Sequence, residues 1–248
     1  METDKLHNKF ESCFRDWIIQ QHQDLEELLQ ALTSNPDTEN LQLLAEKGLK
    51  HFEEYQDNRA LLAQYDAPAL LCPVWCTSFE NAFLWIGGCR PSVSIRLIYS
   101  LCGSEINDAQ VSTLFQVERK GNLAEISSDQ LNLINSVHCK IIKEEERLSE
   151  RMASLQEEIA DDPLVMIAKK ASEVGESSCL DLDEALKGPS LSLERLLVDA
   201  DKLRLSTLKE LMNILTPLQT ADLLVATKKL HLSMHEWGKR RDEQLGRK

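Results

Sequence analysis

The sequence contains few of the residues that interrupt regular structure. Of 248 residues, only 9 are glycine and 7 are proline, while 42% are apolar and 28% are charged. This composition is typical of ordered globular proteins and argues against a disordered chain. Leu, Ala, Glu, Lys and Gln are abundant, and these residues favour the α-helix. We therefore expect a helical chain that is long enough to bury a sizeable core.

Positive charge is also scarce, because 28 Lys and Arg stand against 41 Asp and Glu, which gives a net charge of −13. Affinity for nucleic acids depends on neutralising phosphates with Lys and Arg, so direct binding of DNA or RNA is not expected. Binding to anionic membrane surfaces is disfavoured for the same reason. The longest apolar run, Ala67 to Cys76, is about half of the roughly 20 residues that a membrane span needs. No membrane association is predicted.

Signals for secretion and for disulfide bonding are not evident. Residues 1–5 are polar and acidic, unlike a signal peptide. The seven cysteines are odd in number, and most lie in apolar stretches, as small core residues of a reducing compartment do. We expect the protein in the nucleus or the cytoplasm. Cys72 and Cys76 lack a second matched pair of ligands, so buried thiols are predicted there rather than a metal site.

Motifs of catalysis are not found either. There is no nucleophile with a neighbouring base, no His-Glu-x-x-His and no glycine-rich dinucleotide loop, so we do not expect an enzyme. The segment Gly87–Ser92 lacks the Gly-Lys-Ser/Thr ending of a phosphate loop, and no strand precedes it. Arg90 and Arg96 could hold an anion at a helix N-terminus, but we favour pairing with carboxylates of the bundle.

Hydrophobic periodicity predicts an all-α fold, a single bundle of about eight helices with long antiparallel neighbours. No alternation of period two is long enough for a sheet. Residues 1–9 are expected to form a tail and residues 10–245 one helical domain. An extended crossing is expected at 66–75 and a mobile loop at 175–190. The expected helices cover 10–32, 39–64, 77–86, 91–102, 107–117, 127–159, a segment from 162, 193–215, and 217 to 238 or beyond.

Local signals fix several helix starts. The sequences that begin at Thr77, Ser127 and Thr216 have the form of a capping box, with Glu or Gln three residues later. The segment Phe83–Ser92 joins bulky apolar residues to a double glycine and then to Arg-Pro-Ser. It predicts a tight corner between two buried helices.

Residues 131–159 carry a heptad-like seam of about four repeats. Two of its members, His138 and Glu145, are polar. We favour a helix within the bundle over a zipper between two copies, although a homodimer stays open. The seam consists of Leu131, Ile134, His138, Ile141, Glu145, Leu148, Met152, Leu155 and Ile159.

His231 and His235 are four residues apart and share one face of a helix, a spacing that can bind one metal ion or offer a ligand to haem iron. They cannot be the two axial ligands of one haem on a continuous helix, because those ligands approach from opposite faces of the ring. From the residues alone we favour packing beside Leu230 and Trp237.

Four separated motifs together resemble the plant seed-dormancy domain, which is found in Delay of Germination proteins and in the C-terminal part of TGA-type bZIP factors. The resemblance covers roughly residues 10–245. Nothing here is similar to the basic region and zipper of the TGA factors. The motifs are Phe83–Ser92, Ala200–Arg204, Leu215–Ala221 and Lys229–Gly238.

This resemblance implies a non-enzymatic regulator of seed maturation, dormancy and abscisic-acid response. It further implies that the N-terminal helix contacts clade A type 2C protein phosphatases, here through Phe14, Asp16 and Trp17 of the segment 11–17. Phe14 and Trp17 lie three apart on one face, as an anchor in a groove requires, or as packing within the bundle requires. At Cys13 and Arg15 the segment departs from the family sequence, which is more acidic there.

The resemblance also implies haem as a cofactor, because His231 and His235 stand in the matching motif. Three functions therefore remain in competition. The first is an adaptor that restrains a phosphatase, the second a transcription-associated regulator that works with a DNA-binding partner, and the third a haem-responsive sensor.

Overall fold

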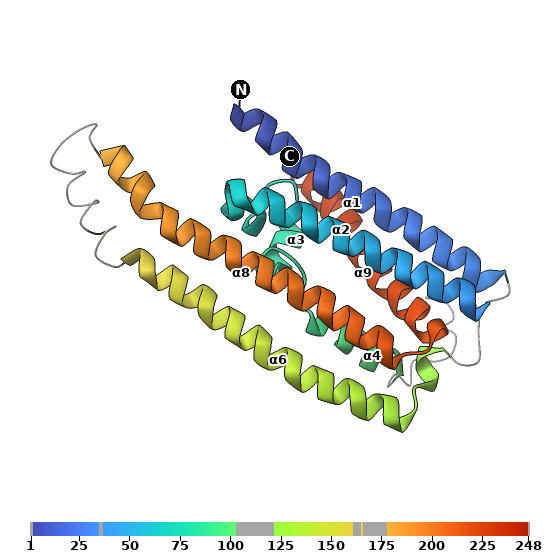
Figure 1. Cartoon of the computed structure of the whole chain (residues 1–248). Coiled ribbons are helices and arrows are strands. Elements are labelled where there is room, and N and C mark those ends of the chain that lie inside the picture. The colour runs from blue at the N-terminus through green and yellow to red at the C-terminus, as the bar shows by residue number, and fades with distance from the viewer. Residues whose placement is uncertain (1, 35–36, 103–121, 161–164, 166–177, 248) are drawn as a thin grey trace.

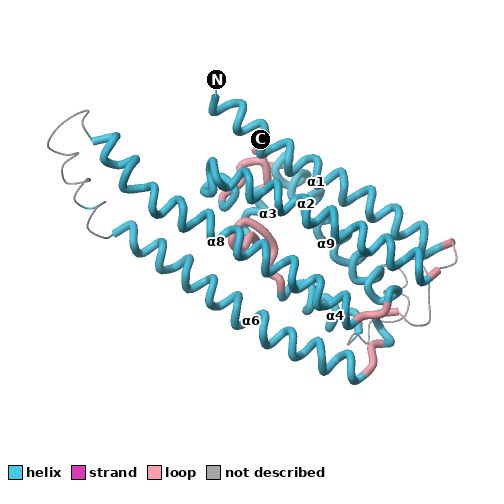
Figure 2. Tube along the Cα trace, in the orientation of Figure 1, coloured by secondary structure: helices cyan, strands magenta, loops and turns pink. Residues whose placement is uncertain are grey.

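The computed structural model describes residues 2–34, 37–102, 122–160, 165 and 178–247. Within these ranges the chain forms seven α-helices and two short 3-10 helices, and Figure 2 shows no strand among them. The all-α prediction is confirmed. The helices are α1 (Glu2–Thr33), α2 (Thr38–Leu71), α3 (Ser78–Phe83), α4 (Ser92–Cys102), α6 (Ser128–Glu157), α8 (Ser178–Ile214) and α9 (Pro217–Gln244), and the 3-10 turns are Leu123–Glu125 and Glu158–Ala160.

The five long helices lie side by side with their axes roughly aligned (Figure 1). α2 packs against α1, α8 and α9, and α8 also packs against α6. α1 packs directly on α9, so the first and last helices of the chain are neighbours. The short helices α3 and α4 pack on α9. Both chain ends lie at the same end of the bundle (Figure 1).

Three helices begin with the capping boxes that the sequence predicts. In each box the hydroxyl of the first residue accepts a backbone N–H three residues later, and the Glu or Gln side chain accepts the backbone N–H of the first residue. Pro217 occupies the first turn of α9, where no N–H is needed. The boxes are Thr77 with Glu80, Ser127 with Gln130 and Thr216 with Gln219.

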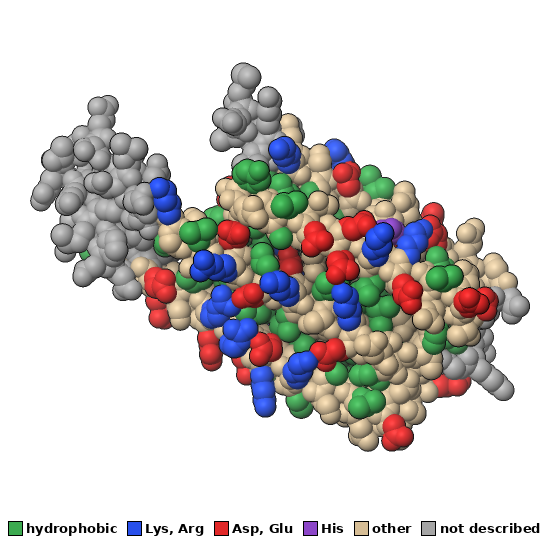
Figure 3. Space-filling view, viewed as in Figure 1, with side chains coloured by type: hydrophobic (Ala, Val, Ile, Leu, Met, Phe, Trp, Pro, Cys, Tyr) green, Lys and Arg blue, Asp and Glu red, His purple; other side chains and the backbone are tan. Residues whose placement is uncertain are grey.

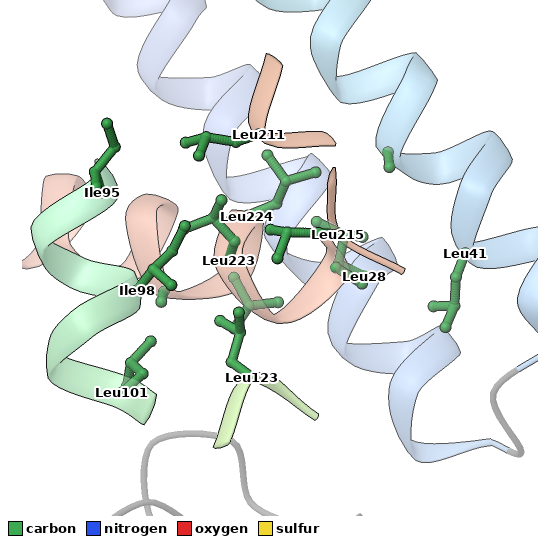
Figure 4. Close-up of a cluster of buried hydrophobic side chains, with 14 of the residues drawn as sticks. Leu28, Leu41, Ile95, Ile98, Leu101, Leu123, Leu211, Leu215, Leu223 and Leu224 are labelled. Carbon is green, nitrogen blue, oxygen red and sulfur yellow. The ribbon is translucent and has the colours of Figure 1, made fainter. Parts of the chain in front are cut away.

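The main core lies where α1, α2, α4, α6, α8 and α9 converge (Figure 4). In α9 every residue from 219 to 226 is buried, so this helix is surrounded rather than amphipathic at its start. Fully buried side chains at this centre include Leu28, Leu41, Ile95, Ile98, Leu123, Leu211 and Leu223.

Two boundaries differ from the prediction in the first half of the chain. α1 begins at Glu2, so most of the expected tail 1–9 is helical. The expected extended crossing at 66–75 is helical as far as Leu71. Asp66 leaves helical geometry (φ −159°, ψ 82°), and its Oδ1 accepts the N–H of Ala69 at 3.1 Å. Asp66 thus caps a new turn after a kink, and this turn tolerates Pro68 near its start.

Two further expectations are corrected. α3 ends at Phe83, so Leu84 to Ile86 lie beyond the helix that was expected to carry them. The expected loop 175–190 is helical from Ser178 onward, and α8 continues through Pro189. The predicted helices at 107–117 and from 162 fall outside the described residues, apart from residue 165.

The polar members of the α6 seam have partners inside the molecule. Glu145 is 2% exposed and accepts hydrogen bonds from Ser92 N at 2.7 Å and from Ser92 Oγ at 3.0 Å. Arg90 Nε lies 3.1 Å from the same carboxylate. His138 contacts the ring of Tyr99. The α6 seam therefore packs within the bundle, against α8 and α4. Glu145 is the anion at the N-terminus of α4 and also the carboxylate partner of Arg90.

The face seen in Figure 3 carries acidic and basic side chains interspersed, without a large patch of one sign. Over the part of the chain that the structure describes, no helix combines the length and the apolar character that a membrane crossing requires.

Candidate functional site

The link between α3 and α4 contains a reverse turn at Trp85–Gly88. Trp85 N donates to Gly88 O at 2.7 Å, and Gly88 N donates to Trp85 O at 3.3 Å. Ile86 and Gly87 have positive φ values of 45° and 68°, as in the type I′ turn of tight hairpins. A β-branched residue rarely adopts positive φ, so the contacts around Ile86 must hold it there. The expected corner is a hairpin-like turn joining two helices.

Two buried arginines hold this turn by its carbonyl oxygens. Arg204 of α8 and Arg59 of α2 share the carboxylate of Asp201, whose Oδ1 accepts from Arg204 Nη1 at 2.6 Å and whose Oδ2 accepts from Arg59 Nε at 3.0 Å. Their remaining donors reach the turn. The acceptors are the carbonyl oxygens of Trp85, Ile86 and Cys89 for Arg204, and that of Gly87 for Arg59.

The double glycine is required by this close approach. A Cβ atom on Gly87 would lie 2.7 Å from Leu197 Cδ1 and 2.7 Å from the carbonyl oxygen of Leu70. A Cβ atom on Gly88 would lie 2.9 Å from Arg204 Cζ. The glycines therefore let the turn press against α2 and α8.

His235 belongs to a buried polar chain between α9 and α3. Its Nδ1 lies 2.9 Å from Glu80 Oε1, while Glu80 Oε2 accepts from Thr77 N at 2.9 Å and from Thr77 Oγ1 at 2.8 Å. Burial alone would raise the pKa of Glu80, but the hydrogen bonds from His235 and Thr77 outweigh it and hold the pKa below its ordinary value. The hydrogen bond of His235 thus links the α3 capping box to α9.

The predicted partner segment lies on α1 with its two rings turned toward the bundle. Phe14 meets the ring of His235 edge to face at 5.6 Å between centroids. Trp17 stacks on Tyr55 of α2, with centroids 4.5 Å apart and an interplanar angle of 3°. Asp16 is exposed. The structure therefore shows the packing alternative for both rings and leaves Asp16 on the surface.

Beneath these rings lies a cavity of about 430 Å³. Its lining comes from α1, α2, α3, α4, α8, α9 and the links on either side of α3, and includes the Arg59–Asp201–Arg204 cluster. Its volume falls in the range of about 300–1,000 Å³ that is usual for small-molecule sites. The cavity is the candidate functional site.

His231 lines this cavity, whereas His235 is not among its lining residues. Burial lowers the pKa of His231 to about 4, so its imidazole is neutral at physiological pH. The structure therefore separates the two histidines that the resemblance implies for haem. His235 is committed to Glu80, and only His231 faces the space where a ring could lie. The arrangement does not fit a haem held by both histidines, and haem binding stays a prediction.

Sequence reasoning missed the residues that build the site. Arg59 and Gln56 face inward from α2 although their types favour the surface, and nothing local marks them. Asp201 and Arg204 lie in one of the family motifs, and their spacing of three residues places them on one helix face. The shared target of Arg59 and Arg204, a row of carbonyl oxygens far away in the sequence, has no sequence signal.

Comparison with known proteins agrees with these motifs. A family model described as seed dormancy control matches residues 24–100, which include Arg59, Glu80 and the turn. Three relatives come from Arabidopsis thaliana. The protein DOG1-like 3 is 35% identical over 94% of this chain and 84% of the relative, DOG1-like 1 is 34% identical over 98% and 93%, and the transcription factor TGA2 is 26% identical over 88% and 59%.

The match to the DOG1-like proteins extends over nearly the whole chain and most of each relative, and the family model covers part of the site. The protein therefore belongs to the seed dormancy control family.

Proposed function

We propose that this protein regulates seed dormancy and the response to abscisic acid by binding other proteins, without catalysing a reaction. Family membership supports the process, and one relative of 25% identity is named for its response to abscisic acid and salt. The proposed partner is a clade A type 2C protein phosphatase, met in the nucleus or the cytoplasm. Haem coordination is not part of this proposal.

One observation carries the choice of a partner surface. An open groove of about 680 Å³ runs between α1 and α2 beside the segment that the family resemblance assigns to phosphatase binding. Asp16 and Trp17 form its α1 side. Leu61 and Tyr65 form part of its α2 side and are 58% and 71% exposed. Exposed apolar groups with a nearby carboxylate suit an apolar anchor and a basic side chain of a partner.

The test is a pull-down of a clade A phosphatase with charge-reversed variants of α1. Asp16→Lys changes the groove edge without removing a packed ring, so we expect capture to fall at least tenfold. Glu26→Lys reverses an exposed charge on the same helix outside the groove and serves as the matched control. Equal capture of both variants and the wild type contradicts the proposal.

Phe14→Ala and Trp17→Ala are less informative here, because both rings pack in the bundle and their loss also weakens the fold. Leu61→Arg instead places a charge in the groove from α2. Its capture should fall as for Asp16→Lys, while its thermal unfolding stays within a few degrees of the wild type.

A second candidate function follows from the match to TGA2, named a transcription factor. In this alternative the chain acts on transcription with a DNA-binding partner. A gel shift distinguishes the two. The acidic chain should not shift DNA alone, and a further shift of a DNA-bound bZIP factor would favour the alternative.

A further inference from the structure

The cavity beneath α1 reaches the surface between α3, α4 and α9. Three apolar side chains that line it, Phe83, Val93 and Leu230, are 61%, 37% and 40% exposed. They therefore form its rim. Rings of α1 and α2 also line it, including Trp17, Phe52 and Tyr55. A molecule that enters past the rim would lie against aromatic side chains.

One buried polar group in the wall has an unmet hydrogen bond. Gln56 is 7% exposed, lines the cavity, and its Nε2 has no hydrogen-bond partner. A buried donor without an acceptor costs stability, which is why nearly all such groups are satisfied. An acceptor on a bound molecule would satisfy this one.

The charged groups of the wall already have partners within the molecule. Arg59 and Arg204 share Asp201, and both also donate to backbone carbonyl oxygens of the link between α3 and α4. Arg90 at the surface side is paired with Glu145. Burial raises the pKa of Tyr55 to about 12, so its phenol stays protonated. A charged ligand would therefore lose its hydration and meet charged groups that already have partners.

We propose that this cavity binds an uncharged, flat and mainly apolar small molecule with one hydrogen-bond acceptor, a ketone or lactone carbonyl, which Gln56 Nε2 meets. The acceptor lies at Gln56, the ring system lies against Trp17 and Tyr55, and entry is past Phe83 and Val93. This site goes beyond the proposed regulatory function and does not depend on phosphatase binding.

The test is a fluorescence titration of the full chain with prodan, an uncharged naphthalene that carries one ketone. We expect saturable binding with one site and a blue-shifted emission. Gln56→Leu keeps the size of the side chain and removes the donor, so affinity should fall about tenfold, which corresponds to one hydrogen bond of about 1.4 kcal/mol. Gln64→Leu, on the exposed side of α2, should leave affinity unchanged.

Two variants separate binding from folding. Val93→Trp narrows the rim at an exposed position, so it should abolish binding while thermal unfolding is kept. Gln56→Leu removes the unmet donor, so the protein without prodan should become more stable even as prodan binds less well. A structural role of Gln56 predicts the opposite sign.

Three outcomes overturn the proposal. One is prodan binding that neither Gln56→Leu nor Val93→Trp weakens. Another is equal or tighter binding of anilinonaphthalene sulfonate, an anionic naphthalene, with the same dependence on Val93. The third is displacement of prodan by hemin that His231→Ala prevents, which would assign the cavity to haem.

Discussion

Asp201 forms ion pairs with two buried arginines, Arg59 and Arg204. It is 7% exposed and pairs with two arginines, which together bind three carbonyl oxygens of the turn and that of Cys89. Each arginine is therefore held by both a carboxylate and the backbone, and the positive φ of Ile86 is fixed by this network. A single substitution at Asp201 leaves two buried cations with one partner fewer.

We expect Asp201→Asn to lower the free energy of unfolding by about 3–5 kcal/mol, the usual cost of breaking a buried ion pair. Asp199→Asn on the same helix breaks the half-exposed pair with Arg151, and its cost should stay below about 1 kcal/mol. Urea denaturation of the three proteins measures the difference. Similar losses for the two variants would show that the buried cluster does not stabilise the fold.

A second prediction at the residue scale concerns pH. The pKa of His231 is about 4 in the folded chain against 6.5 without the fold, so the unfolded chain binds more protons between these values. Above pH 6.5 the imidazole is neutral in both states and does not change the free energy of unfolding. As the pH falls toward 4, proton uptake by the unfolded chain lowers the free energy of unfolding, by about 2 kcal/mol at pH 5.

His231→Gln should therefore lose less stability between pH 7 and pH 5 than the wild type, by about that amount. Urea denaturation at the two pH values measures it. The other histidines are common to both proteins and cancel in the comparison. An identical pH dependence of the two proteins would contradict burial of the neutral imidazole.

At the scale of elements, local signals were sufficient wherever a helix start carries its own cap. The starts at Thr77, Ser127 and Thr216 were predicted because their hydrogen bonds lie within four residues. The end of α3 at Phe83 and the kink of α2 at Asp66 were not predicted. The turn at 85–88 is held by arginines of α2 and α8, which are distant in the sequence. Glu145 is a polar residue in the apolar seam of α6, and its partner lies on α4.

Alanine substitutions at two helical glycines should change the stability of the protein in opposite directions. A Cβ atom on Gly238 of α9 would overlap Thr77 Oγ1, whereas on Gly48 of α2 it would lie 3.8 Å from its nearest neighbour, Asp24 Oδ2. Gly48→Ala should stabilise the protein by about 0.5–1 kcal/mol through helix propensity. Gly238→Ala should destabilise it by about 1–3 kcal/mol, because the α3 cap must move.

Thermal unfolding of both glycine variants beside the wild type measures these shifts. The signs should differ, since the intrinsic gain is the same at both sites. Stabilisation by both would mean that Thr77 can move away from α9 at little cost.

At the scale of the whole molecule, the all-α class and the family were accessible from composition, periodicity and motifs. The placement of α9 was not, because its residues 219–226 are buried on every side and show no amphipathic face. The candidate site was only partly accessible, since it is assembled from segments far apart in the sequence whose inward-facing polar residues carry no local pattern.

The central position of α9 predicts that a chain ending at Leu215 does not fold. Its circular dichroism should keep helical character but lose a cooperative urea transition, because the core loses the helix that the others surround. A chain ending at Gln244 removes only residues beyond the helix and should unfold like the full chain. A cooperative transition in the shorter chain would show that α9 is dispensable.

The pair between Lys228 and Asp24 has a further consequence during synthesis. These buried residues lie 2.9 Å apart, and 204 positions separate them in the sequence. At typical rates of translation, α1 waits on the order of 10–40 s before its partner on α9 exists. During that interval Asp24 has no lysine to meet, and Phe14 lacks the ring of His235. The N-terminal helix is therefore made first and completes its contacts last.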